Sequence, residues 1–507
     1  MSSVRRNFSY NLMYQFLSIG SVLLVTPYIT RTLGANQTGV YSYTLANAHY
    51  FLLFAMLGLN NYGSRQIARA KAEGERLHEP CRMEEPCKQD GRRQCEEPCR
   101  QDEPCGQEQQ GADKRTDILS RTFWSIYALQ FLTAMTAVLC YLGYLLFGAV
   151  EDKNIACIQL LYVASALADI NWFFFGMEQF KLTVIRNSMV KLASIAAVFL
   201  LIKKPGDLWI YTIIMAGSIF ISALALWPYL PRFVKPVRLK GREIAAHIKP
   251  NLVLFIPVIA ISVYNVMDKI MIGRLLHNKA EVSYYDNAYK VMEIPHAFIN
   301  ALGMVMLPKM SALVQKGEHR QGRLYIEKSM HFTLLLAFAV SFGLASVADN
   351  LAPVYFGKEF LPCGVLMRWL APLGVIKSWA NVIRTQYLLP NQHDKIYVAS
   401  VAGGAVVNII ANLLLIPRMG TLGAVIGTLL AETAVMLYQT IYAARELPVG
   451  KYIRQGIPYG AAGFIMYLAV SSIGRMAEAS LLLVAGQVAA GVFLYGVFIA
   501  IFAMRKF

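Results

Sequence analysis

Residues Thr122–Val150 form one of several long stretches that contain no charged side chain. About 20 consecutive apolar residues are enough for an α-helix to cross the hydrocarbon core of a bilayer. Further uncharged stretches lie at 208–231, 396–417, 455–474 and 481–504. A soluble protein would bury one or two such helices, whereas here they run from one end of the chain to the other. The sequence therefore predicts an all-α integral membrane protein.

The composition agrees with a membrane protein and argues against nucleic acid as a partner. Charged residues make up 16% of the chain, compared with about 25% in soluble domains. The formal net charge is +17, and membrane proteins concentrate Lys and Arg in the loops that stay in the cytoplasm. We therefore assign most of the basic excess to loops, and expect membrane lipids as neighbours and no nucleic acid.

The apolar runs predict about fourteen transmembrane helices. They are expected near 8–33, 38–64, 121–148, 154–176, 180–202, 208–230, 248–275, 284–312, 328–349, 362–390, 394–416, 421–444, 455–474 and 479–504.

The distribution of Lys and Arg predicts the orientation of these helices. An even number of spans places both termini on the same side. If that side is the cytoplasm, the inner loops contain the basic clusters at 232–249, 316–328 and 445–454, and the outer connections are short and poor in Lys and Arg. Basic loops stay inside, so we expect a multi-pass membrane protein with both termini cytoplasmic.

The segment 73–117 does not follow the membrane pattern. It contains 13 acidic and 8 basic residues and repeats the tripeptide Glu-Pro-Cys four times, between 79 and 105. Its five cysteines are separated by five, seven, three and five residues, whereas zinc modules favour two to four between paired ligands. A metal or redox role stays open as an alternative. We expect a disordered insert, because such a composition cannot bury enough apolar surface to fold.

No sequence motif of an enzyme is present. The chain lacks the GxxxxGK[ST] nucleotide-binding loop as well as GxSxG and HExxH. Apart from the segment 73–117, no loop is long enough to form a catalytic domain. We therefore expect a transporter and not an enzyme, with no cofactor and no metal.

Charged residues inside the predicted helices are the candidate functional residues. A charge in lipid is costly, so such residues face a cavity or a partner. The basic candidates suit a substrate that bears phosphate, and the acidic ones are candidates for proton or sodium coupling or for charge pairs. The basic set is Arg31, Arg186, Lys269, Lys290, Lys377 and Arg384, and the acidic set is Asp268, Glu293 and Glu432.

Simpler roles stay open for several of these residues. Arg31, Arg186 and Lys377 lie near the ends of predicted helices, where long side chains can reach the membrane interface. Lys290 and Glu293 are three residues apart and could pair on one helix face. In the same way, Lys269 could serve only to neutralise Asp268.

Several motifs resemble one family along nearly the whole chain. The opening segment 7–68, DINWFFFGMEQFKLTVIRNSMVK at 169–191, SVYNVMDKIMIG, VSYYDNAYKVMEIP, ALGMVMLPKMSAL and NIIANLLLIPRMGTLGAVIGTLLAE at 408–432 carry the likeness. They resemble the Wzx-type oligosaccharide flippases of polysaccharide biosynthesis, in the multidrug/oligosaccharidyl-lipid/polysaccharide superfamily. Only 73–117 departs, since the family has a short basic loop there.

The resemblance implies two six-helix lobes with two helices appended. The lobes would be 1–230 (helices 1–6, with the insert 73–117) and 231–444 (helices 7–12), followed by 445–507 with helices 13 and 14. Parallel repeats of this kind are known in transporters. The implied activity is the transfer, by alternating access, of undecaprenyl-pyrophosphate-linked repeat units from the cytoplasmic to the outer leaflet. A polysaccharide polymerase and glycosyltransferases are the implied partners.

Three other functions stay open. A flippase for the peptidoglycan precursor lipid II would share the fold and carry a related cargo. A drug or cation antiporter of the same superfamily would favour acidic residues in its cavity, whereas basic residues predominate here. A membrane glycosyltransferase or polymerase would need a large outer loop or a soluble domain, which the sequence does not show.

Overall fold

A computed structural model describes residues 2–76 and 105–504, and all the regular structure in these two segments is helical. The principal helices are α1 (Ser2–Met56), α2 (Leu59–Arg76), α3 (Cys105–Phe147), α4 (Lys153–Ile158), α5 (Leu160–Ala168), α6 (Asn171–Gly176), α7 (Phe180–Leu201), α8 (Leu208–Leu224), α9 (Gly241–Ala245), α10 (Ile248–Leu275), α11 (Lys279–Gln315), α12 (His319–Tyr355), α13 (Leu361–Leu370), α14 (Pro372–Ile383), α15 (Asp394–Met419), α16 (Thr421–Ala443), α17 (Val449–Gly474) and α18 (Leu481–Met504).

Four short helices complete the described chain. They are η1 (Pro205–Asp207), η2 (Trp227–Arg232), η3 (Lys358–Phe360) and the π-helical turn η4 (Arg384–Leu388).

Ten helical segments within the described residues are long and apolar enough to cross a membrane. An eleventh results if the pair Lys358–Leu370 and Pro372–Leu388, bent by 44°, counts as one span. This pair corresponds to the helix expected at 362–390, and proline at the start of α14 explains the break, because it lacks the N–H that would continue the preceding helix. The helices expected at 8–33, 38–64 and 248–275 are helical but are not among these spans. The number fourteen stays a prediction.

The first two expected helices meet at a glycine kink. α1 runs through both, but Gly34 has φ 78° and ψ 174°, outside the helical region. Glycine tolerates positive φ without steric cost, so the chain turns at Gly34 from one helical segment of α1 into the next. A second break at Leu57 and Gly58, both with positive φ, separates α1 from α2. The helix expected at 38–64 is therefore divided between two elements.

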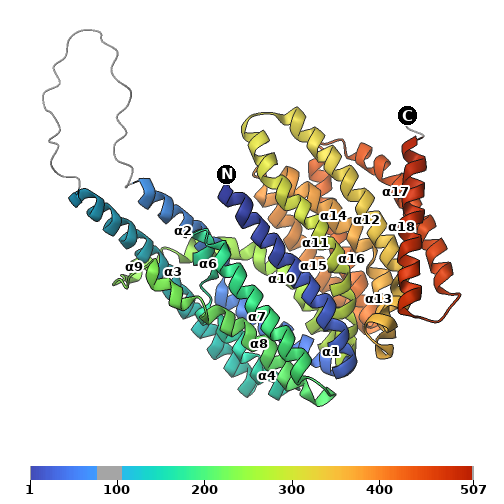
Figure 1. The fold of residues 1–507 in the computed structure, drawn as a ribbon, viewed down its shortest axis with the longest axis horizontal. Coiled ribbons are helices and arrows are strands. Elements are labelled where there is room, and N and C mark those ends of the chain that lie inside the picture. The colour runs from blue at the N-terminus through green and yellow to red at the C-terminus, as the bar shows by residue number, and fades with distance from the viewer. Residues whose placement is uncertain (1, 77–104, 505–507) are drawn as a thin grey trace, which may run out of the picture.

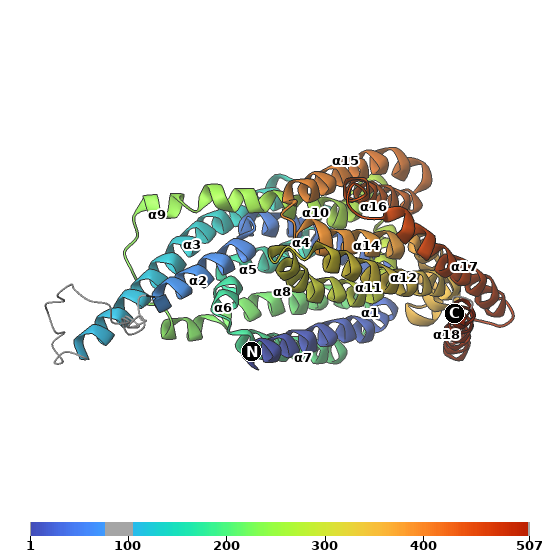
Figure 2. The same ribbon diagram turned by 90° about the horizontal axis from the view of Figure 1, so that it is seen from above.

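The helices form two groups on either side of α1 and α10. Figures 1 and 2 show α2–α8 on one side and α11–α18 on the other. We call these the N-terminal group and the C-terminal group. The N-terminal group has an aromatic core around Trp172 and Phe123, and the C-terminal group buries Tyr285 and Phe356. α1 packs against α3, α5 and α7 and also against α10 and α11, so it belongs to both.

The insert is helical at both of its ends, which differs from the expected disorder. Glu73–Arg76 continues α2, and Cys105–Asp117 opens α3. The first piece adds about one turn to the polar helix α2, and the second adds a few polar turns to the start of the apolar part of α3. An existing helix needs no new nucleation to grow. Residues 77–104, with four of the five cysteines, lie outside the described residues. The expectation for them is neither supported nor contradicted.

Candidate functional site

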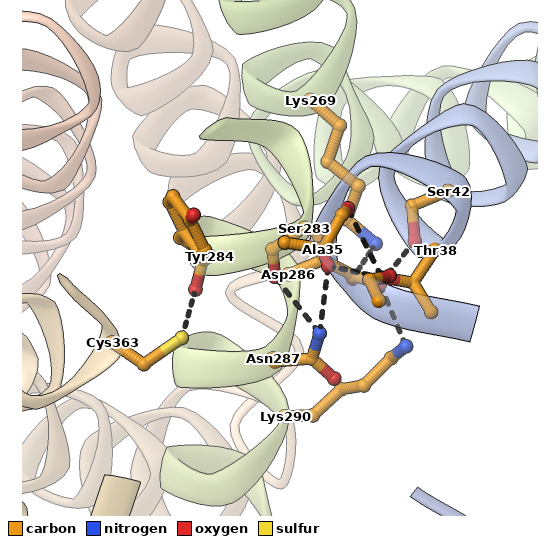
Figure 3. Close-up of polar contacts among 11 residues, drawn as sticks. Ala35, Thr38, Ser42, Lys269, Ser283, Tyr284, Asp286, Asn287, Lys290 and Cys363 are labelled. Carbon is orange, nitrogen blue, oxygen red and sulfur yellow. Dashed lines mark hydrogen bonds and ion pairs between the residues drawn. The ribbon is translucent and has the colours of Figure 1, made fainter. Parts of the chain in front are cut away.

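Asp286 is the centre of a charged cluster between α1, α10 and α11. Only 2% of this residue is exposed. Its Oδ1 lies 2.5 Å from Nζ of Lys269, and its Oδ2 lies 2.6 Å from Nζ of Lys290. Ser42 of α1 donates a hydrogen bond of 2.7 Å to Oδ2. Figure 3 shows both lysines converging on this carboxylate. We call these four residues the Asp286 cluster, which has a formal charge of +1.

Close packing of α1 against α11 surrounds this cluster. Oγ1 of Thr38 lies 2.6 Å from Oγ of Ser283, one turn before Asp286 (Figure 3). A Cβ atom added to Gly39 would lie 1.7 Å from the backbone oxygen of Lys279, so only glycine permits this approach. The polar contact between the two helix groups thus follows one face of α11.

The lysines of the cluster do not have the partners considered from the sequence. Lys269 pairs with Asp286 and not with its neighbour Asp268, because adjacent residues on a helix do not face each other. Lys290 also pairs with Asp286, four residues earlier, and not with Glu293. Neither of the two pairs left open as alternatives in the sequence analysis forms in the structure.

Glu293 belongs instead to a second charged group around Lys377 of α14. Nζ of Lys377 lies 2.5 Å from Oε1 of Glu293 and 3.9 Å from Oε1 of the buried Glu432. It also donates a 3.1 Å hydrogen bond to the hydroxyl of Tyr289. Lys377 therefore joins α11, α14 and α16 within the C-terminal group.

Arg384 lies beside this second group. It begins η4, donates a 2.7 Å hydrogen bond to Oδ1 of Asn381, and has its guanidinium 5.8 Å from the ring centre of Tyr397. Arg384, Lys377 and Glu432 all line one cavity between α10 and the C-terminal group. The structure therefore brings together three residues that the sequence named separately.

Asp268 lies at the centre of a third group of contacts, in which its hydrogen-bond partners are uncharged. The residue is fully buried. It accepts hydrogen bonds from the hydroxyls of Tyr285 and Thr428, the latter at 2.6 Å, and from Nδ2 of Asn412 at 2.6 Å. These partners come from α11, α16 and α15. The site suits a protonated carboxyl group or a bound monovalent cation.

The two predicted arginines of the first half of the chain lie apart from these groups. Arg31 is exposed on α1 and donates to the backbone oxygen of Val354 near the end of α12. Arg186 of α7 is buried and donates a 2.8 Å hydrogen bond to Oδ1 of Asn171. The former links α1 to the C-terminal group, and the latter is part of the N-terminal group.

Sequence reasoning missed Asp286, the residue that organises the first cluster. Its spacing of four from Lys290 within SYYDNAYK was a visible signal, because residues four apart share a helix face. Ser42 gave no such signal, since its role depends on contact between helices far apart in sequence. Among residues 2–76 and 105–504, no three His, Cys, Asp or Glu side chains are arranged to hold a metal ion.

Comparison with known families decides where the chain belongs. Residues 4–79 and 107–314 match the family described as polysaccharide biosynthesis protein. The chain belongs to this family. The match omits the centre of the Cys-containing insert, as expected for a segment that the family lacks, and includes α1, α10 and the whole Asp286 cluster.

Relatives of known name are similar over much of the chain. A putative O-antigen transporter of Escherichia coli K12 is 20% identical over 85% of this chain and 95% of its own length. One from Shigella dysenteriae is 23% identical over 55% of this chain and 70% of its own. A lipid II flippase of Bacillus subtilis is 23% identical over 41% of each chain. The resemblance stated from the sequence is confirmed.

Solved structures show the fold. The lipid II flippase MurJ in an inward closed conformation superposes with a TM-score of 0.70 at 14% identity, over 99% of both chains. An inward-facing multidrug transporter of the same superfamily gives 0.58 at 12% identity, over 87% of this chain and 96% of its own. The protein is thus an all-helical, multi-pass membrane protein of polysaccharide biosynthesis, with the fold of superfamily transporters.

Proposed function

We propose that this protein carries an undecaprenyl-pyrophosphate-linked oligosaccharide from the cytoplasmic to the outer leaflet of the bacterial inner membrane. The sugars of such a cargo need a polar path, the diphosphate needs cations, and the lipid tail can stay in the bilayer. The two helix groups would rock against each other to give alternating access. Glycosyltransferases would build the cargo before this step, and a polymerase would use it afterwards.

The observation that carries the proposal is that Lys269 and Lys290 share one carboxylate. Two ammonium groups on one buried Asp286 leave the cluster with an excess positive charge. The side chain of Lys290 is 43% exposed, so its ammonium group can exchange one carboxylate contact for a phosphate oxygen. Charge-assisted hydrogen bonds to phosphate are among the stronger polar contacts.

The same cluster would couple cargo binding to the contact between α1 and α11. Ser42 of α1 hydrogen-bonds the carboxylate that both lysines hold. An anion that draws Lys290 away from Asp286 changes the contact between α1 and α11, which joins the two helix groups. Binding energy at the diphosphate would therefore bias the movement that carries the cargo across.

The rival functions fit this chain less well. The excess positive charge of the Asp286 cluster repels a cationic drug. The lipid II precursor bears a similar diphosphate, so the cluster does not separate it from a polysaccharide repeat unit. The sequence relatives favour the repeat unit, because the O-antigen transporter of Escherichia coli aligns in sequence with 85% of this chain and the lipid II flippase of Bacillus subtilis with 41%.

Asp268 is the residue we propose for coupling to a proton or sodium gradient. Its hydrogen-bond partners in the described parts of the chain are two hydroxyls and an amide, none of them basic. A buried carboxylate without a positive partner is stable only when it is protonated or binds a cation. Its occupancy would change the packing of α10 against α15 and α16. Replacement of Asp268 by Asn should abolish gradient-driven transport and leave cargo binding unchanged.

Complementation tests the proposed function and separates it from its rivals. The gene would be expressed in a bacterial strain that lacks its own O-antigen transporter and, separately, in one depleted of its lipid II flippase. We expect recovery of surface polysaccharide in the first strain and no growth rescue in the second. Growth rescue without surface polysaccharide would favour the lipid II precursor, and failure in both strains at normal protein level would contradict the proposal.

A further inference from the structure

A polar cavity of about 170 Å³ lies between α10 and four helices of the C-terminal group, α11, α14, α15 and α16. One water molecule needs roughly 10–15 Å³ of such space, so the cavity takes a group the size of one sugar ring. Lys377 and Arg384 contribute positive charge to its wall, and Tyr397 contributes an aromatic ring. Ile261, Val401 and Val435 complete an apolar side. The wall therefore combines charged, aromatic and apolar side chains.

Three acceptor oxygens on this wall have no hydrogen-bond donor anywhere in residues 2–76 and 105–504. They are Oδ1 of Asn300, Oε1 of Glu432 and Oε1 of Gln439. Glu432 is 5% exposed and Gln439 is 1% exposed. Nζ of Lys377 lies 3.9 Å from Oε1 of Glu432, which is beyond hydrogen-bonding range. Buried acceptors without donors are costly, so each of the three needs a donor, which water or the hydroxyl groups of a bound molecule can supply.

The chemistry of the wall selects a neutral polyol among the candidate ligands. A phosphate group has few donors and would place its charge beside Glu432. A cation would meet Lys377 and Arg384. Sugar hydroxyl groups can donate to the three free oxygens and accept from the basic side chains, while the C–H face of the ring packs against Tyr397.

α11 connects this cavity with the Asp286 cluster. Asn300 lies ten residues after Lys290 on the same helix, a distance of about 15 Å along the axis at 1.5 Å per residue. A diphosphate at Lys290 and a sugar beside Asn300 would therefore belong to one extended cargo molecule.

We infer that this cavity is a subsite for one neutral sugar residue of the cargo, held by hydroxyl hydrogen bonds to Asn300, Glu432 and Gln439. The inference rests on the proposed function, because it assumes that the cargo is a lipid diphosphate bearing sugars. It adds that the protein binds the sugar as well as the diphosphate, and that the residues that bind the sugar lie in the C-terminal group. Glu432 then accepts a hydrogen bond from the sugar and does not couple transport to an ion gradient.

Binding to the purified protein in lipid nanodiscs tests the subsite. The probes are undecaprenyl diphosphate and the same lipid carrying a linear trisaccharide of glucose, of galactose or of N-acetylglucosamine, because the first sugar is bonded to the diphosphate and a longer chain is needed to reach Asn300. We expect at least one sugar-bearing probe to bind several times more tightly than the bare lipid. The variants Gln439→Met and Asn300→Leu should each reduce this preference about two- to tenfold, the effect of one neutral hydrogen bond.

Gln386→Met is the matched control. Gln386 is equally buried in the same helix group, and its amide also has no partner in the described chain, but it does not line the cavity. It should keep the preference of the unmodified protein, and a thermal melt of each variant checks that it is folded.

The outcomes separate the inference from the proposed function. No binding of any probe contradicts the proposed function itself. Equal binding of the bare and sugar-bearing lipids leaves the diphosphate proposal standing and overturns the subsite. A sugar preference that persists in both Gln439→Met and Asn300→Leu, or that Gln386→Met reduces equally, also overturns it.

Discussion

Nζ of Lys290 lies 2.6 Å from Oδ2 of Asp286, which precedes it by four residues on α11. The ion-pair partner of Lys290 is therefore Asp286 and not Glu293. Glu293, three residues after Lys290, is held by Lys377 of α14 at 2.5 Å. Lys290 is therefore one of two lysines on one carboxylate, and its charge is not needed to neutralise Glu293.

Replacement of Lys290 by Gln should lower export of surface polysaccharide by about 10- to 100-fold, the effect of losing one charged hydrogen bond to the cargo. Membrane protein level should stay normal, because Lys269 still neutralises Asp286. The double variant Asp286→Asn/Lys290→Gln should not recover export, although no unpaired acid remains. Lys316→Gln, on an exposed lysine after α11, is the control. Full export from the double variant would show that Lys290 serves only as a partner of Asp286.

Replacement of Gly39 by Ala should disturb the contact between α1 and α11. The added methyl group would meet the backbone oxygen of Lys279 at 1.7 Å, and overpacking of this kind typically costs about 1–3 kcal/mol. We expect a lower melting temperature and lower export. Gly20→Ala in the same helix has no atom within 4 Å of the new carbon and should be neutral. Equal melting temperatures for the two variants would contradict this close approach.

The membrane class and most helices could be predicted because they depend on local composition. Uncharged stretches specify spans such as those of α3, α15, α16 and α18 directly. The breaks were harder to predict. A glycine inside an apolar run, as at Gly34, is compatible with a straight helix until packing selects positive φ. The division of 154–176 into α4, α5 and α6 had no comparable local signal.

The candidate site was predicted only as a set of residue types. The cost of burying charge identifies Lys269, Lys377 and Glu432 from sequence. It does not tell which charges meet, because the partners come from helices distant in the chain. Asp286 contacts Ser42 across 244 residues and Lys377 contacts Glu293 across 84. Neighbours in sequence suggested Lys290 with Glu293 and Lys269 with Asp268 as possible pairs, and the structure gives these lysines and Glu293 other partners.

Stability should fall as the pH drops below about 6.5, because of His247. This residue precedes α10, and its ring nitrogens lie 2.6 Å from the hydroxyl of Tyr62 and 2.9 Å from that of Ser125. Burial holds the pKa of His247 below its ordinary value of 6.5. The unfolded chain therefore binds the proton more readily, so the stabilisation is complete above pH 6.5 and is lost as the pH falls toward the folded-state pKa.

Thermal melts between pH 7.5 and 5 measure this effect, which is limited to about 1.4 kcal/mol per pH unit for one proton. His247→Gln should flatten the pH dependence. His319→Gln, on an exposed histidine at the start of α12, should leave it unchanged. An identical pH dependence in His247→Gln and the unmodified protein would exclude His247 as the cause.

Removal of the Cys-containing repeats should leave export intact. The family match stops at 79 and resumes at 107, and the composition of the omitted segment is too polar to form a core. Replacement of 80–104 by a short Gly/Ser/Lys linker keeps α2 and α3 complete. Surface polysaccharide should stay within about twofold of the unmodified level. Loss of export at normal protein level would show that the repeats have a function of their own.

Labelling of Cys95 tests the predicted orientation. If both termini are cytoplasmic, the connection between α2 and α3 is cytoplasmic too, and a membrane-impermeant thiol reagent should modify Cys95 only after the cells are opened. The measurement uses a variant whose seven other cysteines are replaced by Ser, of the eight in the chain. A cysteine introduced at Lys358, in the predicted outer connection before α13, should react in intact cells. Reaction of Cys95 in intact cells would reverse the topology, and the proposed direction of transport with it.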